Sequence, residues 1–302
     1  MDLLGLRWGL SRRPSVFHST YYTLPALEGL RSVVTVHDFV DRQFPAFSPN
    51  GPGFVRIQEQ AIASADALIA VSEATRKAMI SLTSKPRSSI SVIPHGVSSH
   101  FQPRGGTVAH KMSFAWNYTG NRPYWLFVGK RTSYKNFGTL LRAFAKVAQR
   151  DRAHCLVVVG GKAKLEPYQD EFIIETNIED RVIVLPVVDE EILRDAYIGA
   201  TAFIYPSLAE GFGIPILEAM ACGTPVIASD IPVFREVAGC HALFFDPHNI
   251  DDLSRLLTES IDYDYRADFA GKGIQRAAGF SWEDAALQQA YIYRTLSHMK
   301  RH

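Results

Sequence analysis

The chain of 302 residues is long enough for two domains of ordinary size or for one large one. Hydrophobic residues make up 47% of it and charged residues 21%, a composition typical of a globular protein that buries a core. The formal net charge is +1, so charge alone gives no attraction to nucleic acid or to an anionic membrane. Any anion must therefore bind at a local site.

Neither the cysteines nor the first residues indicate export. The three cysteines, Cys155, Cys222 and Cys240, are scattered and lack the paired spacing of a metal site. They favour a reducing compartment over a disulfide framework or a zinc site. The apolar run in residues 1–16 is too short, and too interrupted by arginine, for a signal peptide or a membrane span. We therefore expect a cytoplasmic protein.

The first third of the chain predicts alternating strands and helices. Short β-branched or apolar runs predict strands at 32–39, 67–72 and 89–97. Helical periodicity follows the proline- and glycine-rich loop 44–53, and it returns at 73–82, where Ser72 is placed as the N-cap. The polar, irregular stretch 102–122 predicts an interdomain linker.

After the linker the alternation becomes regular. Strands are predicted at 124–129, 155–161, 180–186, 201–206 and 225–229. Helices are predicted at 136–150, 189–200, 214–223, 250–261 and 280–296. Near-continuous apolar strands that alternate with helices are typical of a parallel sheet covered on both faces, so the fold class is α/β.

The most informative segment is Tyr205–Ser229, which predicts a strand, a glycine-rich loop and a helix. Glycines at 211 and 213 allow positive φ angles and a close approach of the backbone to a ligand. Pro215 suits the first helical position, and Gly223 suits the position just past the helix end. The free N–H groups and positive dipole end of this helix make a site suited to a phosphate.

Two carboxylates, Glu210 and Glu218, flank this loop. An ionised glutamate accepts hydrogen bonds from the diol of a sugar or a ribose. Taken alone, an acid at Glu218 more often only complements the helix dipole. The two glycines are also a weak signal, and the dinucleotide-binding fingerprint fails because Ile216 stands where its third glycine belongs.

The sequence EGFGIPILE at 210–218, followed by AMACGTPVIAS, closely resembles the E-x7-E signature of the group 1 (family 4) retaining glycosyltransferases. Further similar stretches are spread over residues 17–296, namely 17–25, 33–45, 68–77, 128–147, 180–213 and 280–296. The resemblance implies the GT-B fold, with two Rossmann-like domains of parallel strands and no catalytic metal. It implies an acceptor-binding domain at 1–110, a donor-binding domain at 111–280 and a C-terminal helix at 281–302 that crosses back.

The resemblance also implies roles for the residues of the motif. Glu210 would contact the transferred sugar and Glu218 the ribose of the nucleotide. Backbone N–H groups would be presented to the sugar and the diphosphate by Gly211, Phe212, Gly213 and Ile214.

A diphosphate leaving group needs positive charge, and no cofactor or metal is expected to supply it. The basic loop after the strand at 124–129 contains Lys130, Arg131 and Lys135. By the family pattern Lys135 is the catalytic candidate for the phosphates, with Lys130 or Arg131 as its companion. A solvated basic loop is the alternative. An Asp-x-Asp triplet marks the other, metal-dependent glycosyltransferase fold. Such a triplet occurs here at 262–264, and we interpret it as a turn at a helix end.

His37 and Asp38 match the family's acceptor-side His-Asp pair, at the end of a predicted strand. Strand ends in such sheets face the ligand crevice. His37 is a catalytic candidate that would orient the acceptor hydroxyl or the donor sugar, while Asp38 would hold its tautomer. His37 is not assigned as the base, because the leaving phosphate can serve that purpose.

The sequence departs from the family pattern at its start. Family members have further strand–helix units before the segment that begins here at Phe17, so we expect an incomplete N-terminal domain that limits transfer more than donor binding. Self-association through the exposed sheet edge would then be unsurprising. Pro186, where glycine is common, and His95, where asparagine is usual, leave the nucleotide base open.

The function predicted is transfer of a hexose, with mannose preferred, from a GDP- or UDP-linked donor to a saccharide or lipid-linked acceptor in glycan or polysaccharide biosynthesis. A lipid-linked acceptor would bring the protein to the inner face of the membrane. No nucleic acid partner is expected. The alternatives are a non-catalytic remnant that binds sugar nucleotides and, disfavoured by the E-x7-E spacing, a nucleotide-sugar epimerase.

Overall fold

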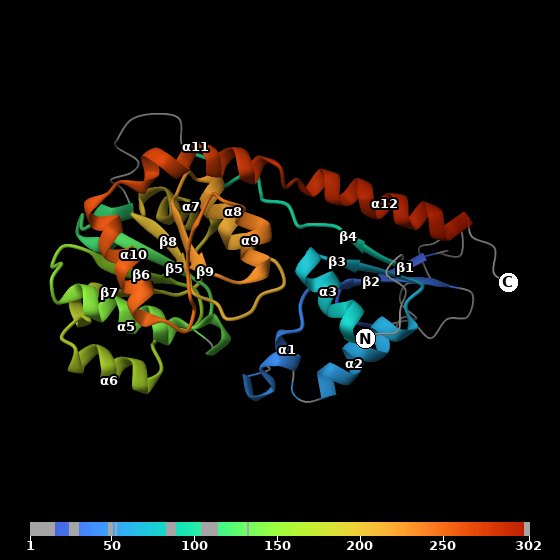
Figure 1. Ribbon diagram of the computed structural model, residues 1–302, viewed down its shortest axis with the longest axis horizontal. Helices are drawn as coiled ribbons and strands as arrows, with labels where there is room; N and C mark the ends of the chain where they lie inside the picture. The colour runs from blue at the N-terminus through green and yellow to red at the C-terminus, as the bar shows by residue number, and fades with distance from the viewer. Residues whose placement is uncertain are drawn as a thin grey trace. The chain divides into compact units, whose positions relative to one another are not determined.

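The computed structural model describes residues 16–23, 30–47, 51, 53–82, 89–103, 114–131 and 133–298. The chain forms two compact units, each with its own parallel sheet (Figure 1). Unit 1 comprises residues 1–96 and 282–302, and unit 2 comprises residues 97–281. The division after residue 96 precedes the boundary at residue 110 expected from the sequence, and residue 110 lies outside the described residues.

Unit 1 contains a four-stranded sheet of order β1-β2-β3-β4 in which every neighbouring pair is parallel. Its strands are β1 (Val16–Ser19), β2 (Arg31–Val36), β3 (Ala67–Ala70) and β4 (Ile90–Val92). Its helices before residue 96 are α1 (Val40–Gln43), a 3₁₀ turn (Pro45–Phe47), α2 (Gly53–Ser64) and α3 (Glu73–Leu82). The Ser72 hydroxyl accepts a hydrogen bond of 3.0 Å from the N–H of Thr75, which confirms the predicted cap of α3.

The last helix of the chain, α12 (Trp282–His298), belongs to unit 1 and packs on β1 and β2. His18 joins the two elements, since its Nδ1 lies 2.5 Å from the Tyr293 hydroxyl and its Nε2 lies 2.7 Å from the Thr35 hydroxyl. Tyr293 donates its own proton to Gln289. The Nδ1 of His18 must therefore carry the proton, and burial lowers the pKa of this histidine.

Unit 2 contains a six-stranded parallel sheet of order β10-β9-β8-β5-β6-β7. Its strands are β5 (Tyr124–Val128), β6 (Cys155–Val159), β7 (Val182–Leu185), β8 (Ala202–Tyr205), β9 (Val226–Ser229) and β10 (Leu243–Phe245). Its α-helices are α5 (Phe137–Ala148), α6 (Pro167–Glu175), α7 (Glu190–Gly199), α8 (Ile214–Ala221), α9 (Pro232–Ala238), α10 (Ile250–Asp262) and α11 (Tyr265–Ala278). Short π and 3₁₀ turns lie at Ala115–Thr119, Ser133–Lys135 and Glu179–Arg181.

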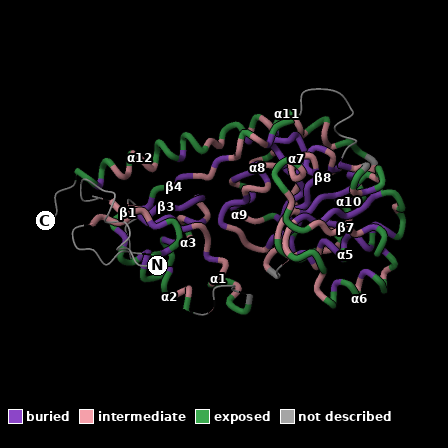
Figure 2. The backbone as a smooth tube through the Cα atoms, turned by 180° about the vertical axis from the view of Figure 1, so that it is seen from behind, coloured by how far each residue is buried: buried purple, intermediate pink, exposed green. Residues whose placement is uncertain are grey.

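The alternation of side chains along the strands distributes the core of unit 2 over both faces of the sheet. Trp125 and Phe127 of β5 point to one face and pack in a cluster with α5 and α10. Tyr124 points to the other face, where its hydroxyl donates to the carbonyl of Ala196 in α7. Figure 2 shows these strands buried and much of α6 exposed. The predicted α/β class with helices on both faces is therefore confirmed.

Helix α11 was not predicted from the sequence. Two glycines, at 271 and 273, weaken its helical pattern. The structure explains one of them: a Cβ added to Gly273 would lie 3.4 Å from the side chain of Met220, so the glycine lets α11 pack closely on α8. The helix begins where Asp264 accepts a hydrogen bond from the N–H of Arg266. The triplet 262–264 is therefore a turn between two helices, as predicted.

The order of strands in unit 2 indicates the edge of the sheet at which a ligand is expected. The chain runs from β5 outward to β6 and β7, then returns to the other side of β5 for β8, β9 and β10. The loops that leave β5 and β8 therefore diverge at their carboxyl ends, which is where ligands bind in open α/β sheets. Within the described residues, every helix is either too short or too polar to cross a bilayer.

Candidate functional site

The loops after β5 and β8 bring a lysine and a glutamate into contact. Lys135 ends the turn Ser133–Lys135, and its Nζ lies 2.6 Å from Oε1 of Glu210. Both side chains are largely buried, with exposed fractions of 15% and 13%. The ammonium also donates to the hydroxyl of Tyr205, at 3.2 Å. Tyr205 is the last residue of β8, and its burial, together with the nearby Glu210 carboxylate, raises its pKa well above the usual value.

The glycine-rich loop leads directly from this ion pair into α8. Gly213, the N-cap residue, has a φ of 111°, and a Cβ there would lie 3.2 Å from the ring of Phe234. A side chain at this position would therefore be strained twice, by its φ angle and by the ring. Pro215 stands in the first turn, one position later than predicted. The first N–H groups of a helix have no partner within it, and the dipole makes this end attractive to an anion.

Glu218 lies on α8 one turn beyond the loop and is held by a tyrosine from the neighbouring helix α7. The hydroxyl of Tyr197 donates to Oε2 of Glu218 at 2.9 Å, and Tyr197 is completely buried. Burial raises the pKa of Glu218 to about 7, against the hydrogen bond from Tyr197, which lowers it. At neutral pH the Glu218 carboxyl group is therefore partly protonated and partly ionised.

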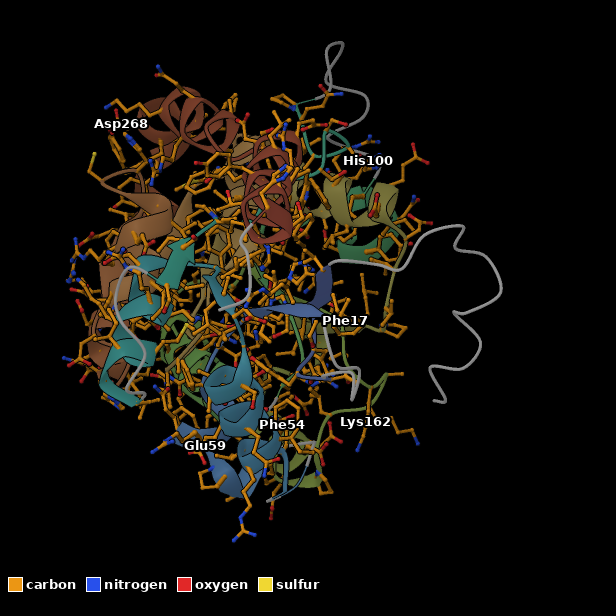
Figure 3. All side chains as sticks on the ribbon, turned by 90° about the vertical axis from the view of Figure 1, so that its right-hand side faces the viewer. Phe17, Phe54, Glu59, His100, Lys162 and Asp268 are labelled. Carbon is orange, nitrogen blue, oxygen red and sulfur yellow. The ribbon has the colours of Figure 1, made fainter. Side chains whose placement is uncertain are left out.

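Arg131 makes contacts that the sequence did not indicate. Its guanidinium donates to three backbone carbonyls of the loop after β6, namely those of Gly160 (2.9 Å), Lys162 (2.6 Å) and Lys164 (2.9 Å). The neighbouring Lys130 is exposed, as is the side chain of Lys162 (Figure 3). Arg131 thus stabilises a loop at the ligand edge, and its predicted contact with a diphosphate stays a prediction.

Replacing Arg131 with alanine should lower the free energy of unfolding by about 2 kcal/mol, because charged hydrogen bonds to three carbonyls are lost. Chemical denaturation measures this, with Lys130→Ala as the matched control that should leave stability unchanged. If the two variants were equally stable, the guanidinium would not hold the loop.

His37 and Asp38 lie in unit 1, directly after β2. The Nε2 of His37 lies 3.0 Å from the carbonyl oxygen of Thr20. Because a carbonyl can only accept, Nε2 carries a proton in this contact. Asp38 accepts a hydrogen bond of 2.9 Å from the N–H of Val40 at the start of α1. The backbone of Thr20 thus holds the proton at Nε2, and the predicted hold of Asp38 on the tautomer of His37 stays a prediction.

His95, which follows β4, stacks on His37 with ring centroids 5.5 Å apart and planes 19° from parallel. Its other neighbour is Trp282 at the start of α12, with ring centroids 5.2 Å apart. Burial, together with the nearby His37, lowers the pKa of His95 to about 4, so His95 is neutral at pH 7. Nothing in the sequence indicates this stack beyond the placement of both histidines after strands of one sheet.

The structure thus brings together part of the predicted site. Within unit 2, Lys135 and Glu210 form one pair at the start of α8, and Glu218 lies on that helix. Two buried tyrosines that sequence reasoning missed hold these groups, Tyr205 at the first pair and Tyr197 at Glu218. Tyr205 is the first residue of the glycine-rich segment, so its place in the sequence could have pointed to it. No feature of the sequence singles out Tyr197.

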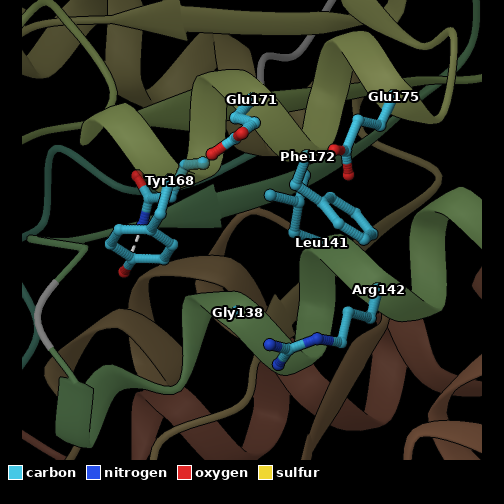
Figure 4. Close-up of a pocket in the computed structure, with 8 residues that line it drawn as sticks. Gly138, Leu141, Arg142, Tyr168, Glu171, Phe172 and Glu175 are labelled. Carbon is cyan, nitrogen blue, oxygen red and sulfur yellow. Dashed lines mark hydrogen bonds between the residues drawn. The ribbon is translucent and has the colours of Figure 1, made fainter.

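A separate groove of about 400 Å³ lies between α5 and α6 (Figure 4). Its lining includes Arg142 on α5 and Tyr168, Glu171 and Phe172 on α6. None of the predicted site residues lines it, so this groove is not part of the candidate site.

Comparison with known families finds a matching family for each of two parts of the chain. Residues 109–276 match the family described as glycosyl transferases group 1, and residues 4–101 match glycosyltransferase family 4. The chain is 31% identical to O-antigen chain mannosyltransferase B of Escherichia coli, over 93% of this chain and 74% of that protein. It is 28% identical to O-antigen chain mannosyltransferase RfbU of Salmonella typhimurium, over 83% of this chain and 69% of that protein.

Solved structures show the same fold. Sucrose-phosphate synthase from Thermosynechococcus elongatus matches with a TM-score of 0.78 at 24% identity, over 93% of this chain and 73% of that one. The Anabaena protein HepE in complex with UDP-glucose matches with a TM-score of 0.75 at 19% identity, over 88% of this chain and 72% of that one. These likenesses confirm the predicted GT-B class. The chain is a glycosyltransferase and belongs to the group 1 glycosyltransferases.

Proposed function

We propose that this protein is a retaining hexosyltransferase that moves a hexose from a nucleoside diphosphate to an acceptor hydroxyl in polysaccharide biosynthesis. The observation that carries the proposal is the buried pair of Lys135 and Glu210, 2.6 Å apart, at the start of α8. A cation beside the N-terminus of a helix suits a diphosphate, and a carboxylate beside both suits the hydroxyls of the attached sugar.

The similar mannosyltransferases favour mannose as the sugar, which makes GDP-mannose the first donor to test. HepE was solved in complex with UDP-glucose, which keeps a UDP-linked donor as the second. The base of the nucleotide is the part of the donor that the described contacts constrain least.

In this proposal the chain itself neutralises the diphosphate, without a metal. Lys135 approaches the phosphates from the loop after β5, and the exposed Lys130 and the carbonyl-bound Arg131 add positive charge to that edge. The backbone N–H groups of residues 211–214 add hydrogen bonds to the leaving oxygens. These groups act in a partly buried position, where a charge interacts more strongly than in water.

The carboxylates then fix the rest of the donor. Glu210, next to Lys135, accepts hydrogen bonds from the transferred sugar, and Glu218 accepts them from the ribose. In the transfer step a bond forms between the acceptor oxygen and the anomeric carbon, while the bond from that carbon to the phosphate oxygen breaks. The acceptor proton passes to the leaving diphosphate. His37 orients the acceptor hydroxyl or the donor sugar.

The acceptor proposed is a saccharide or a lipid-linked saccharide. A lipid-linked acceptor would place the reaction at the cytoplasmic face of a membrane, with the protein bound peripherally. Sedimentation of the protein with vesicles that carry or lack such an acceptor tests this placement.

The activity is tested by incubating the purified protein with GDP-mannose or UDP-glucose and following the anomeric proton by NMR. We expect release of the nucleoside diphosphate with retention at the anomeric carbon, and the same rate after treatment with a chelator. With no acceptor present, slow hydrolysis of the donor is expected.

Two results would count against the proposal. An inverted product would exclude the retaining mechanism, and full loss of activity on chelation, restored by manganese, would exclude charge neutralisation by the chain alone. Absence of both transfer and hydrolysis, with nucleotide binding intact, would favour a protein that binds sugar nucleotides without turning them over.

A further inference from the structure

The hydrogen bond between Tyr197 and Glu218 is separate from the ion pair between Lys135 and Glu210. Tyr197 is in the last turn of α7, and its hydroxyl reaches across to Oε2 of Glu218 on α8, 21 residues away in the chain. Among the described residues this is the hydrogen bond that the structure gives the Glu218 side chain, and it occupies one of its two oxygens. Oε1 is left for a ligand.

Tyr197 itself is rigidly held. Its ring is completely buried and makes edge-to-face contacts with Phe101 and Phe203, at centroid distances of 6.0 and 5.4 Å. Its backbone carbonyl accepts a hydrogen bond of 2.6 Å from the hydroxyl of Thr224, which follows α8. A buried tyrosine with its ring and backbone both fixed can point its hydroxyl in only one direction.

We propose that Tyr197 is a positioning residue that fixes the orientation of the Glu218 carboxylate, so that Oε1 can accept a hydrogen bond from the ribose of the donor. This inference rests on the proposed function of Glu218. The effect is one of preorganisation: a carboxylate locked by one hydrogen bond loses less entropy when the ligand binds.

The charge of Glu218 is sensitive to this contact. From α7, Glu190 disfavours its ionised form and Tyr197 favours it, while burial opposes ionisation. Tyr205 of β8 and Cys222, the C-cap residue of α8, also face it; burial raises the pKa values of both, and the charge of Glu218 adds to this. Loss of the Tyr197 hydroxyl should therefore raise the pKa of Glu218, and a protonated carboxyl accepts a ribose hydroxyl less well.

The test compares Tyr197→Phe with Tyr124→Phe. Tyr124 is a matched control because it is equally buried and also contacts α7, but its hydroxyl donates to the backbone carbonyl of Ala196 and not to a carboxylate. Binding of GDP and UDP to each purified variant is measured by calorimetry from pH 6 to pH 9, together with thermal stability.

We expect Tyr197→Phe to weaken nucleotide binding about tenfold at pH 7 and to move the rise of affinity with pH to higher pH. Tyr124→Phe should leave the affinity and its pH profile unchanged, whatever it does to stability. In a Glu218→Ala background, which leaves no carboxylate for the tyrosine to orient, Tyr197→Phe should cost little further affinity.

Equal affinities and pH profiles in the two phenylalanine variants would overturn the inference. So would a full tenfold loss in the Glu218→Ala background, because the tyrosine would then act through some other group. Failure of the wild-type protein to bind any nucleotide would instead overturn the proposed function, and the two failures are therefore distinguishable.

Discussion

Lys135→Ala is expected to weaken binding of a nucleoside diphosphate at least a hundredfold and to abolish most transfer. The ammonium pairs with Glu210 in the loop that precedes α8, and without a metal its loss leaves the diphosphate facing the Glu210 carboxylate alone. Loss of a charged hydrogen bond and gain of a like-charge contact both act in this direction. Calorimetry with GDP and UDP and the donor-hydrolysis rate measure the effect.

Lys135→Ala also leaves Glu210 buried without its cation, which can destabilise the fold. The double variant Lys135→Met/Glu210→Gln removes both charges and should recover stability without recovering diphosphate binding. Lys146→Ala is the surface control, because that lysine pairs with Asp251 on the exposed side of α5 and α10. Binding that survived in Lys135→Ala with unchanged affinity would show that Lys135 has no contact with the phosphates.

How well the sequence predicts a feature of this protein depends on how far apart in the chain the interacting residues lie. Local features are predictable, because residues a few positions apart decide them: Ser72 caps α3, Pro215 lies in the first turn of α8, one position later than predicted, and Gly223, with its φ of 71°, follows the end of α8. Buried parallel strands are predictable from their apolar runs. Helix α11, which was missed as α6 and α9 were, contains Gly273, and this glycine is explained only by its contact with Met220, which lies far from it in the sequence.

The same difference between local and long-range interactions applies to the candidate site. The spacing of Glu210 and Glu218 places both near one helix, and the resemblance to a family added Lys135. The partners that tune these groups come from other elements, as Tyr197 does from α7 and as His95 does beside His37. No periodicity in the sequence connects such pairs, since strand order and helix packing alone bring them together.

Glu218→Gln should stabilise the unliganded protein at pH 8 while it weakens nucleotide binding about tenfold. Burial raises the pKa of Glu218 from 4.5 to about 7. The folded protein therefore binds this proton more tightly than the unfolded chain, and stability falls as the pH rises from about 4.5 through about 7. Above about pH 7 the full cost of burying the ionised carboxylate is present. The pKa shift corresponds to a loss of about 3 kcal/mol in the free energy of unfolding, at roughly 1.4 kcal/mol per pKa unit. Glutamine cannot ionise, so it avoids this cost.

Chemical denaturation of both proteins at pH 5 and pH 8 separates this effect from a change in packing. Glutamine has nearly the shape of glutamate and still offers Tyr197 an acceptor, so the contact at 2.9 Å is kept. A gain of stability that is large at pH 8 and small at pH 5 identifies the buried charge as its source, whereas an equal change at both values would contradict the raised pKa. A residue that costs stability when ionised and is needed ionised for the ribose is typical of a functional site, where the fold tolerates strain that the ligand relieves.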